Sequence, residues 1–342
     1  MELTAARETK NQLAAFARDL AESHGVPPAP HLVGAEAQAD PVRAPTLSLG
    51  IAPRRNGTYR IAVRYRLGVP TARAFVRRLV AEIGDDDVDV RRTGRIHTAA
   101  RRAHNRHPVA TAQAVGETGR VRPLRPGVSI AHVDVTAGTL GAFVRRAGEP
   151  GTYALSNYHV LAGSPSAQPG DVVVQPGPAD GGVAPDDRVG TLAQVAPLTA
   201  GEPATVDAAL ALLDDGIEVD ATYPVGAVTS VAEVSGREEV EKVGRTTATT
   251  RGRVTAVELD GVVVGYGPEL GTLSFDDQIE VESLGDGPFS RGGDSGSLVY
   301  RADGTAIGLL FAGSETGGSD GTGLTYCNPI GTVLGALGVE LV

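Results

Sequence analysis

The sequence predicts a mostly β protein, an antiparallel barrel or sandwich that follows an N-terminal helix and a small α/β unit. From Val128 onward, short runs of alternating apolar and polar residues are separated by turn residues at intervals of roughly ten positions, which is typical of short antiparallel strands. The 45 Gly and 22 Pro residues suit a fold with many turns. Only 4% of the residues are aromatic and Trp is absent, so the core must be built mainly from Val, Leu, Ile and Ala.

The first segment, residues 1–24, is predicted to be a helix. Leu13 and Phe16 fall on one face at helical spacing, and Gly25 followed by two prolines ends the run. Residues 25–45 are rich in Pro and Ala, which indicates a linker.

Residues 46–97 read as a small α/β domain. Two alternating runs flank an Asn56-Gly57 pair, which is a strong hairpin signal. Helical spacing follows, with Thr71 as the expected cap, and then a short apolar run. The expected elements are two strands, a helix and a third strand, at residues 47–52, 59–67, 71–83 and 88–90.

Residues 98–127 are predicted to form a second, Arg-rich linker. The Arg run that leads into it lacks interleaved aromatic residues, and the whole chain carries a net charge of −10. A solvated linker is therefore favoured over a contact with nucleic acid or an acidic partner. The run comprises Arg91, Arg92, Arg95, Arg101, Arg102 and Arg106.

Residues 128–342 are expected to form one β domain that closes with a helix at residues 330–337. The predicted strands are 139–144, 172–175, 206–213, 225–234, 251–258, 262–266, 270–275, 297–300 and 305–311.

Composition excludes several classes of protein. The acidic net charge of −10 argues against nucleic acid as a partner of the whole chain. The single cysteine, Cys327, permits no disulfide within the chain. No run reaches the roughly 18 apolar residues of a membrane span, and the N-terminus has neither the basic start nor the apolar centre of a signal peptide. We therefore expect a cytoplasmic protein that contacts no membrane and needs no cofactor or metal.

Ser295 is the candidate nucleophile. It lies in the run Gly292-Gly293-Asp294-Ser295-Gly296, just before a predicted strand. Glycines on both sides allow a tight turn that points the amides of Gly293 and Ser295 at one place, as an oxyanion requires. A serine hydroxyl also needs a histidine base, and that histidine needs a buried carboxylate.

His159 and Asp207 are the candidate base and orienting carboxylate. His159 follows a short strand and precedes two apolar residues, and Asp207 precedes the apolar strand 208–213. A carboxylate beside an apolar strand should be buried and partnered, and histidine is a natural partner. The chain order His, Asp, Ser differs from the orders of subtilisins and α/β-hydrolases.

Three other residues compete for these roles. His132 lies at the entry to the domain before a Thr-Ala-Gly turn and is interpreted as structural. Asp214 and Asp215 stand beside Gly216 at a strand end and are interpreted as turn residues.

These motifs carry a family resemblance. Gly293-Asp294-Ser295-Gly296 matches the nucleophile motif of trypsin-like serine peptidases, while Ser156-Asn157-Tyr158-His159-Val160 and Asp207-Ala208-Ala209-Leu210 resemble the His and Asp motifs of HtrA-type enzymes. Val243-Gly244-Arg245-Thr246-Thr247 resembles the start of the second barrel in α-lytic protease. The whole layout is similar to intracellular bacterial and plant trypsin-like proteins of the narrow-leaf type.

The resemblance implies a chymotrypsin-like double antiparallel β-barrel over residues 128–342. It also implies a serine endopeptidase that acts on a protein or peptide substrate through an acyl-enzyme, with the amides of Gly293 and Ser295 as oxyanion donors. Relatives with this layout often assemble, so a homo-oligomer stays among the expectations.

Asp294 needs a partner beneath the active-site turn. The motif alignment puts Lys242 where α-lytic-type enzymes carry an Arg, so a structural ion pair of Asp294 with Lys242 would make the enzyme active without processing. The alternative is a surface lysine in the charged run 238–242.

The resemblance also implies a substrate pocket lined by Phe289, Phe311 and Gly313. Phe289 stands where trypsin carries its aspartate, and no acidic residue is available there to hold Arg or Lys. A small or medium apolar residue is therefore expected before the scissile bond.

Two rival functions stay open. The segment before the barrel could recruit partners, which favours a catalytically weak or inactive trypsin-like scaffold or adaptor. The same segment could block the cleft, which favours a latent protease regulated by its N-terminal region.

Overall fold

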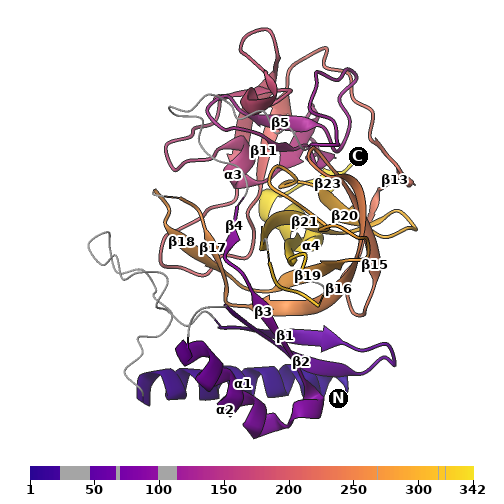
Figure 1. Ribbon diagram of the computed structural model, residues 1–342. Helices are drawn as coiled ribbons and strands as arrows, with labels where there is room; N and C mark the ends of the chain where they lie inside the picture. Colours follow the sequence, from indigo (N-terminus) through magenta and orange to yellow (C-terminus); the bar gives the residue numbers. More distant parts are fainter. Residues whose placement is uncertain (24–46, 67–69, 99–113, 268, 315, 320) are drawn as a thin grey trace.

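Two β-barrels and an N-terminal α/β unit lie one above another in a computed structural model of the chain (Figure 1). The structure describes residues 1–23, 47–66, 70–98, 114–267, 269–314, 316–319 and 321–342. The predicted linker 25–45 lies outside the described residues, as do Arg101, Arg102 and Arg106 of the Arg-rich segment.

The first barrel is a curled sheet with the strand order β23-β7-β8-β11-β10-β9-β5-β6. The sheet curls round because β6 runs on into β7, so that Leu140 N donates to Val128 O beside β5 and Gly141 N donates to Leu155 O on β8, both at 2.9 Å. Its strands are β5 (Ser129–His132), β6 (Gly138–Thr139), β7 (Ala142–Arg145), β8 (Tyr153–Ser156), β9 (Val172–Val174), β10 (Arg188–Val195), β11 (Ala209–Leu213) and β23 (Glu340–Leu341).

The second barrel is closed by six strands that pair in the cycle β15-β16-β19-β22-β21-β20-β15. Its strands are β15 (Glu239–Gly244), β16 (Ala248–Asp260), β19 (Gln278–Ser283), β20 (Leu298–Tyr300), β21 (Thr305–Ser314) and β22 (Thr325–Pro329). The predicted fold class, a mostly β double barrel behind an N-terminal helix and an α/β unit, is confirmed.

Short elements connect and cover the barrels. A hairpin of β17 and β18 extends from β16, and the closing helix α4 packs on the second barrel. These elements are β12 (Thr222–Tyr223), β13 (Gly226–Ala227), β14 (Ser230–Val231), β17 (Val262–Gly265), β18 (Thr272–Phe275), α3 (Tyr158–Leu161), α4 (Ile330–Leu337) and η2 (Pro178–Asp180), while η1 (Asp85–Asp87) belongs to the N-terminal unit.

Two strands with a charged outward face were not predicted from the sequence. β15 and β19 both alternate acidic and apolar residues, and neither was among the predicted strands. The predicted strand 225–234 is wrong, because this stretch holds only the separate two-residue strands β13 and β14.

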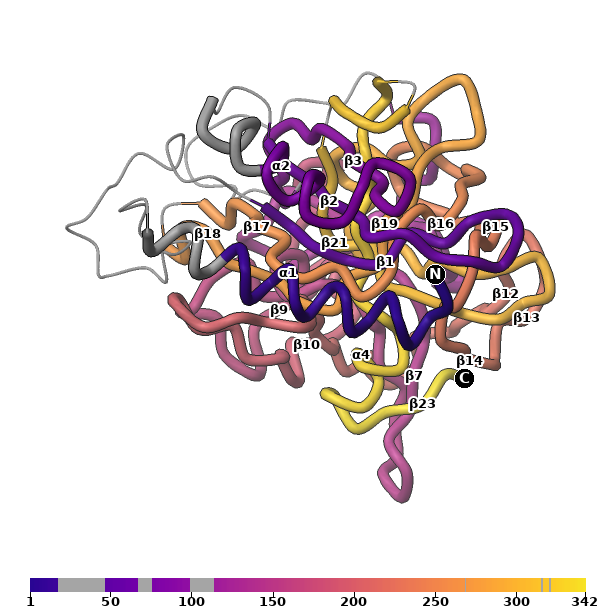
Figure 2. The backbone as a smooth tube through the Cα atoms, turned by 90° about the horizontal axis from the view of Figure 1, so that it is seen from below, coloured from indigo at the N-terminus to yellow at the C-terminus, as the bar shows by residue number. Residues whose placement is uncertain are grey.

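The N-terminal unit is built on the wall of the second barrel. Its strand β1 (Leu47–Pro53) pairs with β16 through Leu49↔Asp260 and Ile51↔Val257, which continues the barrel sheet. Strands β2 (Tyr59–Arg66) and β3 (Val88–Thr93) follow, and helices α1 (Leu3–Ser23) and α2 (Pro70–Ile83) cover the unit (Figure 2).

A buried ion pair joins the N-terminal unit to the second barrel. The side chain of Arg64 on β2 is 2% exposed and its Nε lies 2.8 Å from Glu280 Oε2 on β19, whose side chain is fully buried. Asp89 Oδ2 lies 2.9 Å from Arg64 Nη2, and Thr255 Oγ1 donates to Glu280 Oε1 at 2.7 Å. Burial lowers the pKa of Arg64, but Glu280 and Asp89 outweigh it and the pKa rises, so the guanidinium stays charged.

Two described residues of the Arg run lie in a strand and not in a linker. Arg91 and Arg92 lie in β3. Arg91 pairs with Asp89 at 3.0 Å and with Glu282 at 3.1 Å, and Arg92 Nε donates to Tyr65 Oη at 3.1 Å. Tertiary pairing across the sheet therefore overrides the expectation drawn from local charge.

The segments on either side of residues 99–113 both pack on the barrels. Strand β4 (Ile96–His97) pairs with β21 and β17, between which it lies in Figure 1. Beyond the gap, Val115 N donates to Thr246 O at 2.8 Å, and Leu124 is fully buried in a core cluster that both barrels share.

Candidate active site

The candidate residues come from both barrels, which are joined by a backbone hydrogen bond at the serine. The first barrel supplies His159 from the one-turn helix α3 and Asp207 from the segment before β11. The second barrel supplies Ser295 from the turn before β20, and Thr139 N on the first barrel donates to Ser295 O at 2.8 Å. The turn that holds the serine is thus fixed directly against the first barrel.

His159 and Asp207 form a buried pair. Nδ1 of His159 lies 2.5 Å from Oδ2 of Asp207, and the backbone N–H of His159 donates to Oδ1 at 3.3 Å. The imidazole is 5% exposed and the carboxylate is fully buried. Within the described part of the chain, Nε2 of His159 has no hydrogen-bond partner. The imidazole is therefore held by its Nδ1 side, and Nε2 is left to take a proton.

Three further side chains fix Asp207. Asn157 Nδ2 donates to the backbone carbonyl oxygen of Asp207 at 2.7 Å. The backbone N–H of Asp207 donates to Asn328 Oδ1 at 2.9 Å. Tyr266, just after β17, donates its hydroxyl to Oδ2 at 2.5 Å and sets its ring edge-on to the imidazole of His159. Burial first, and the Asp207 carboxylate second, raise the pKa of Tyr266 well above its usual value, so the phenol stays a donor.

Ser295 lies in a turn that requires glycine on both sides. Gly293 and Gly296 adopt φ values of +97° and +95°, and a Cβ on Gly296 would overlap Ser156 Oγ and Thr139 O. Ser295 is 1% exposed, and its Oγ lies 3.4 Å from the carbonyl oxygen of Phe311, a long and weak hydrogen bond. In this conformation the hydroxyl therefore faces Phe311 and not the imidazole.

The same turn presents backbone donors. Its carbonyls are held from outside, since Thr139 Oγ1 donates to Gly293 O at 2.8 Å and Thr246 Oγ1 donates to Gly292 O at 2.7 Å. The amides of Gly293 and Ser295 donate to no acceptor among the described residues. Two unengaged N–H groups flanking a serine are a suitable donor pair for an oxyanion.

Asp294 is fully buried beneath the turn and is extensively bonded. Its Oδ1 accepts from the amides of Thr246 and Thr247 at 2.9 and 3.1 Å, and its Oδ2 accepts from Thr247 Oγ1 at 2.7 Å and from Arg291 N at 2.9 Å. Lys242 Nζ lies 3.5 Å from the same Oδ2, and both side chains are fully buried.

Lys242 is not a surface residue, because β15 turns it inward between the strands of the closed barrel. Its Nζ also donates to Thr247 Oγ1, and to Ala248 O at 3.0 Å. Burial lowers the pKa of Lys242, and Asp294 opposes that shift.

A second buried ion pair crosses between the barrels beside this turn. Arg245 Nε donates to Asp180 Oδ2 at 2.7 Å, and Ser129 Oγ donates to the same oxygen at 2.6 Å. The guanidinium of Arg245 also lies against Gly293, where an added Cβ would overlap it. Neither Arg245 nor Tyr266 was a candidate from the sequence, because only the fold brings them to the site.

The three predicted pocket residues occupy different surroundings. Phe289 is 2% exposed and packs in the core of the second barrel. Phe311 is fully buried, with its ring centroid 4.7 Å from that of Phe275. Gly313 lies on β21, where it pairs with Thr325 on one side and with His97 on the other.

The competing residues have partners of their own. His132 Nε2 lies 3.3 Å from Asp171 Oδ2, and its Nδ1 accepts from Asp134 N at 3.0 Å. Asp214 pairs with Arg188 at 2.8 Å. These contacts are local to the first barrel.

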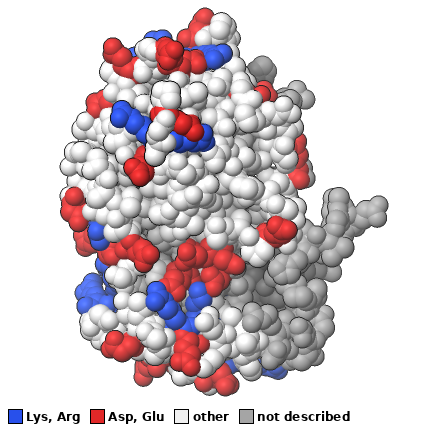
Figure 3. All heavy atoms as spheres, turned by 180° about the vertical axis from the view of Figure 1, so that it is seen from behind, with Lys and Arg blue, Asp and Glu red and all other residues white. Residues whose placement is uncertain are grey.

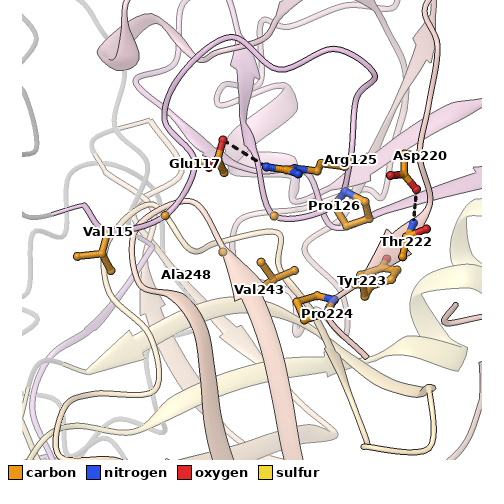
Figure 4. Close-up of a pocket in the computed structure, with 13 residues that line it drawn as sticks. Val115, Glu117, Arg125, Pro126, Asp220, Thr222, Tyr223, Pro224, Val243 and Ala248 are labelled. Carbon is orange, nitrogen blue, oxygen red and sulfur yellow. Dashed lines mark hydrogen bonds and ion pairs between the residues drawn. The ribbon is translucent and has the colours of Figure 1, made fainter. Parts of the chain in front are cut away.

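A pocket of about 380 Å³ is lined by residues other than His159, Asp207 and Ser295 (Figure 4). It is bordered by an ion pair of Glu117 with Arg125 at 3.5 Å and by Asp220, which accepts from Thr222 N at 3.0 Å. Val243 and Gly244 of β15 line it from the side of the second barrel. No candidate catalytic residue lines it.

Charges of both signs lie side by side on the face seen in Figure 3, where a broad uncharged band separates an upper from a lower group. None of the helices in the described ranges is long and apolar enough to cross a membrane. The same ranges hold no group of three or more His, Cys, Asp or Glu side chains arranged to bind a metal ion.

Several solved protease structures are similar to part of the chain. A glutamic acid specific serine protease is 24% identical, with a TM-score of 0.45 over 64% of this chain and 100% of that one. Protease A of Thermobifida fusca is 20% identical, with a TM-score of 0.44 over 64% and 99%. Chymotrypsin of Cellulomonas bogoriensis is 19% identical, with a TM-score of 0.44 over the same shares. No protein-family model and no curated protein sequence matches the chain.

Proposed function

We propose that the chain is a serine endopeptidase that hydrolyses peptide bonds through His159, Asp207 and Ser295. The observation that carries the proposal is the buried His159–Asp207 pair, with Nε2 unengaged, at the same barrel junction as a serine between two left-handed glycines. This set of groups is what acyl transfer at a serine hydroxyl needs.

In the first step, Ser295 Oγ attacks the scissile carbonyl while Nε2 of His159 takes its proton. The hydroxyl must leave the Phe311 carbonyl for Nε2, and it gives up only a 3.4 Å hydrogen bond in doing so. Asp207 accepts from Nδ1 and stabilises the imidazolium that forms. The amides of Gly293 and Ser295 receive the oxyanion.

In the second step, the leaving amine takes the proton from His159, and water then attacks the acyl-enzyme with the same imidazole as base. Asp294 and Lys242 hold the turn from below, which supports an enzyme whose oxyanion donors are in place without cleavage of the chain. Phe289 packs in the barrel core and places no acidic group at that position, and this lack of an anion for Arg or Lys supports preference for a small or medium apolar residue before the scissile bond.

A fluorophosphonate probe tests this proposal. We expect it to label the full-length chain at Ser295, and labelling to vanish in Ser295→Ala and to fall strongly in His159→Ala. A peptide-library digest should give cleavage after apolar residues, and the Ser295→Ala chain should give none. Labelling that persists in Ser295→Ala would overturn the proposal.

A catalytically silent scaffold is the second candidate, and one observation favours it. Ser295 Oγ and His159 Nε2 are not hydrogen-bonded to each other in this conformation. The same probe separates the two functions, because a scaffold would keep the barrels and bind partners but leave Ser295 unlabelled.

A further inference from the structure

β22 pairs with one edge of β21, and β20 pairs with the other edge only as far as Leu309. Beyond Leu309, no barrel strand that the structure describes occupies this second edge, which leads away from Ser295. Leu298 pairs with Leu309, Gly296 N donates to Leu310 O at 2.8 Å, and Ser295 Oγ lies against Phe311 O. The next residues along this edge, from Gly313, therefore border the reactive hydroxyl. An extended peptide that adds to this edge as a strand would bring its backbone to Ser295.

The chain's own segment 93–98 already occupies that edge. Gly313 pairs with His97 and Ser314 pairs with Ile96, both antiparallel. Further out, Gly94 N donates to Thr316 O at 3.0 Å, and Thr93 pairs with Gly317. All these antiparallel pairs share one register, so the segment follows the edge from Gly317 to Gly313.

The direction of the segment matches that of a substrate. Antiparallel pairing makes residues 93–98 run toward Ser295 as the chain proceeds, which is the direction of the acyl side of a peptide aligned for attack at its carbonyl. The paired strand stops at His97, opposite Gly313 and two residues short of Phe311. It thus fills the outer part of the edge and leaves the hydroxyl uncovered by β4.

On the side opposite β21, the segment 93–98 is held by contacts with β17. His97 pairs with Gly265 of β17, and Thr98 N donates to Gly265 O at 3.4 Å. Ile96 packs against the core cluster that contains Phe311 and Leu324. The segment is therefore held between β17 and β21 by backbone pairing and by one apolar side chain.

We infer that residues 93–98 act as a built-in competitor for the acyl side of extended peptide substrates, so that the N-terminal unit restrains the peptidase until this segment leaves β21. The inference rests on the proposed function, since it takes the edge beside Ser295 as the substrate's place. It links the N-terminal unit to the site because β3 leads directly into the segment.

Two substitutions in the full-length chain test the inference. Ile96→Asp places a charge where an apolar side chain packs, and Gly94→Pro removes the N–H that bonds Thr316 O. Arg95→Ser is the matched control, because Arg95 lies between the two positions and its side chain is exposed. Thermal melting establishes that each variant folds cooperatively.

The first readout compares peptide p-nitroanilides of one and four residues that end in leucine. We expect Ile96→Asp and Gly94→Pro to raise kcat/KM at least tenfold on the four-residue substrate and less than twofold on the one-residue substrate. The control should leave the ratio of the two rates as it is in the unsubstituted chain. An unchanged ratio in both folded variants would overturn the inference.

The second readout does not depend on catalysis. In the Ser295→Ala background, a fluorescein-labelled peptide with the sequence of residues 93–98 should bind Ile96→Asp at least tenfold more tightly than it binds the Ser295→Ala chain, as measured by anisotropy. Equal affinities would refute occupancy of the edge. If Ser295 is never labelled and no substrate is cleaved, the proposed function fails, while the anisotropy result still decides whether the segment covers a peptide-binding edge.

Discussion

The Asp207 carboxylate shows how single side chains set the chemistry of this junction. Its Oδ2 accepts from both His159 Nδ1 and Tyr266 Oη at 2.5 Å. A buried carboxylate must be satisfied by donors, and a neutral phenol supplies one without adding a competing charge. Tyr266 thus orients the carboxylate that orients the imidazole, which makes it a positioning residue.

Substitution Tyr266→Phe should lower kcat about tenfold and change KM little, because a lost hydrogen bond to a charged group costs about 1.5–3 kcal/mol and the acceptor stays partly bonded. Steady-state kinetics on one peptide substrate measures both kcat and KM. Tyr59→Phe is the control, since Tyr59 is likewise half-buried and donates its hydroxyl to Ser235 O at 2.6 Å, in the N-terminal unit away from the triad. Equal kcat losses in both variants would mean that Tyr266 acts only through stability.

Lys242→Met should destabilise the chain by about 3 kcal/mol, since it leaves the buried Asp294 carboxylate without its cation. The turn beneath Ser295 should loosen too, so fluorophosphonate labelling should slow by at least tenfold. Urea unfolding and labelling rates measure the two effects. If neither changes, the Lys242–Asp294 pair does not hold the site ready.

The sequence identified the residues whose neighbours form motifs, and it missed those that the fold brings in from elsewhere. His159 and Asp207 are 48 positions apart and meet as the motifs suggested. Tyr266 reaches Asp207 only because the β17–β18 hairpin folds back over the junction, and no local pattern records that. For Lys242, local charge predicted a solvated residue as readily as a buried one, and barrel closure decides between them.

At the scale of elements, β3 and β19 are held together by ionised side chains. Burial raises the pKa of Asp89, but Arg64 and Arg91 outweigh it, so the pKa lies below its ordinary value of 3.8. Burial likewise raises the pKa of Glu282, but Ser319 and Arg91 outweigh burial, so this pKa lies below its ordinary value of 4.5. A carboxylate with a depressed folded pKa adds stability above its unfolded pKa and loses it as pH falls through the folded value.

The chain should therefore lose stability as pH falls below about 4.5 and further below about 3.8, where these carboxylates take up protons. Asp89→Asn should cost about 1–2 kcal/mol at pH 7 and should make the fall below pH 3.8 shallower. Melting temperatures between pH 3 and pH 7 measure both. If the melting temperatures of the unsubstituted chain and of Asp89→Asn fall in parallel with pH, Asp89 does not contribute to stability through its charge.

Alternation of apolar and polar residues predicted most strands, and it failed where the polar face is charged and yet covered. Glu280 illustrates the reason: an acidic residue on a strand is expected to face water, but here Arg64 covers it from the N-terminal unit. Local propensity cannot report a partner that lies 216 positions away.

At the scale of the whole molecule, the N-terminal unit is part of the second barrel's structure. β1 pairs with β16, the buried Arg64 side chain pairs with Glu280, and β4 pairs with the edge of β21. Removing the unit would expose the edge of β16 at residues 257–260 and leave a buried carboxylate unpaired. Exposed strand edges promote aggregation, and breaking a buried ion pair costs about 3–5 kcal/mol.

Residues 114–342 expressed alone should therefore aggregate or melt at least 10 °C below the full chain, which corresponds to roughly 3–5 kcal/mol for a domain of this size. Coexpression with residues 1–98 should restore a folded complex, because the unit binds through paired strands. Glu280→Gln in the short chain should recover part of the loss, since it removes the unpaired charge but not the exposed edge. Size-exclusion chromatography and melting curves measure these outcomes. If the short chain is monodisperse and as stable as the full chain, the N-terminal unit is dispensable for the stability of the barrel. Its role would then be only to occupy the edge of β21.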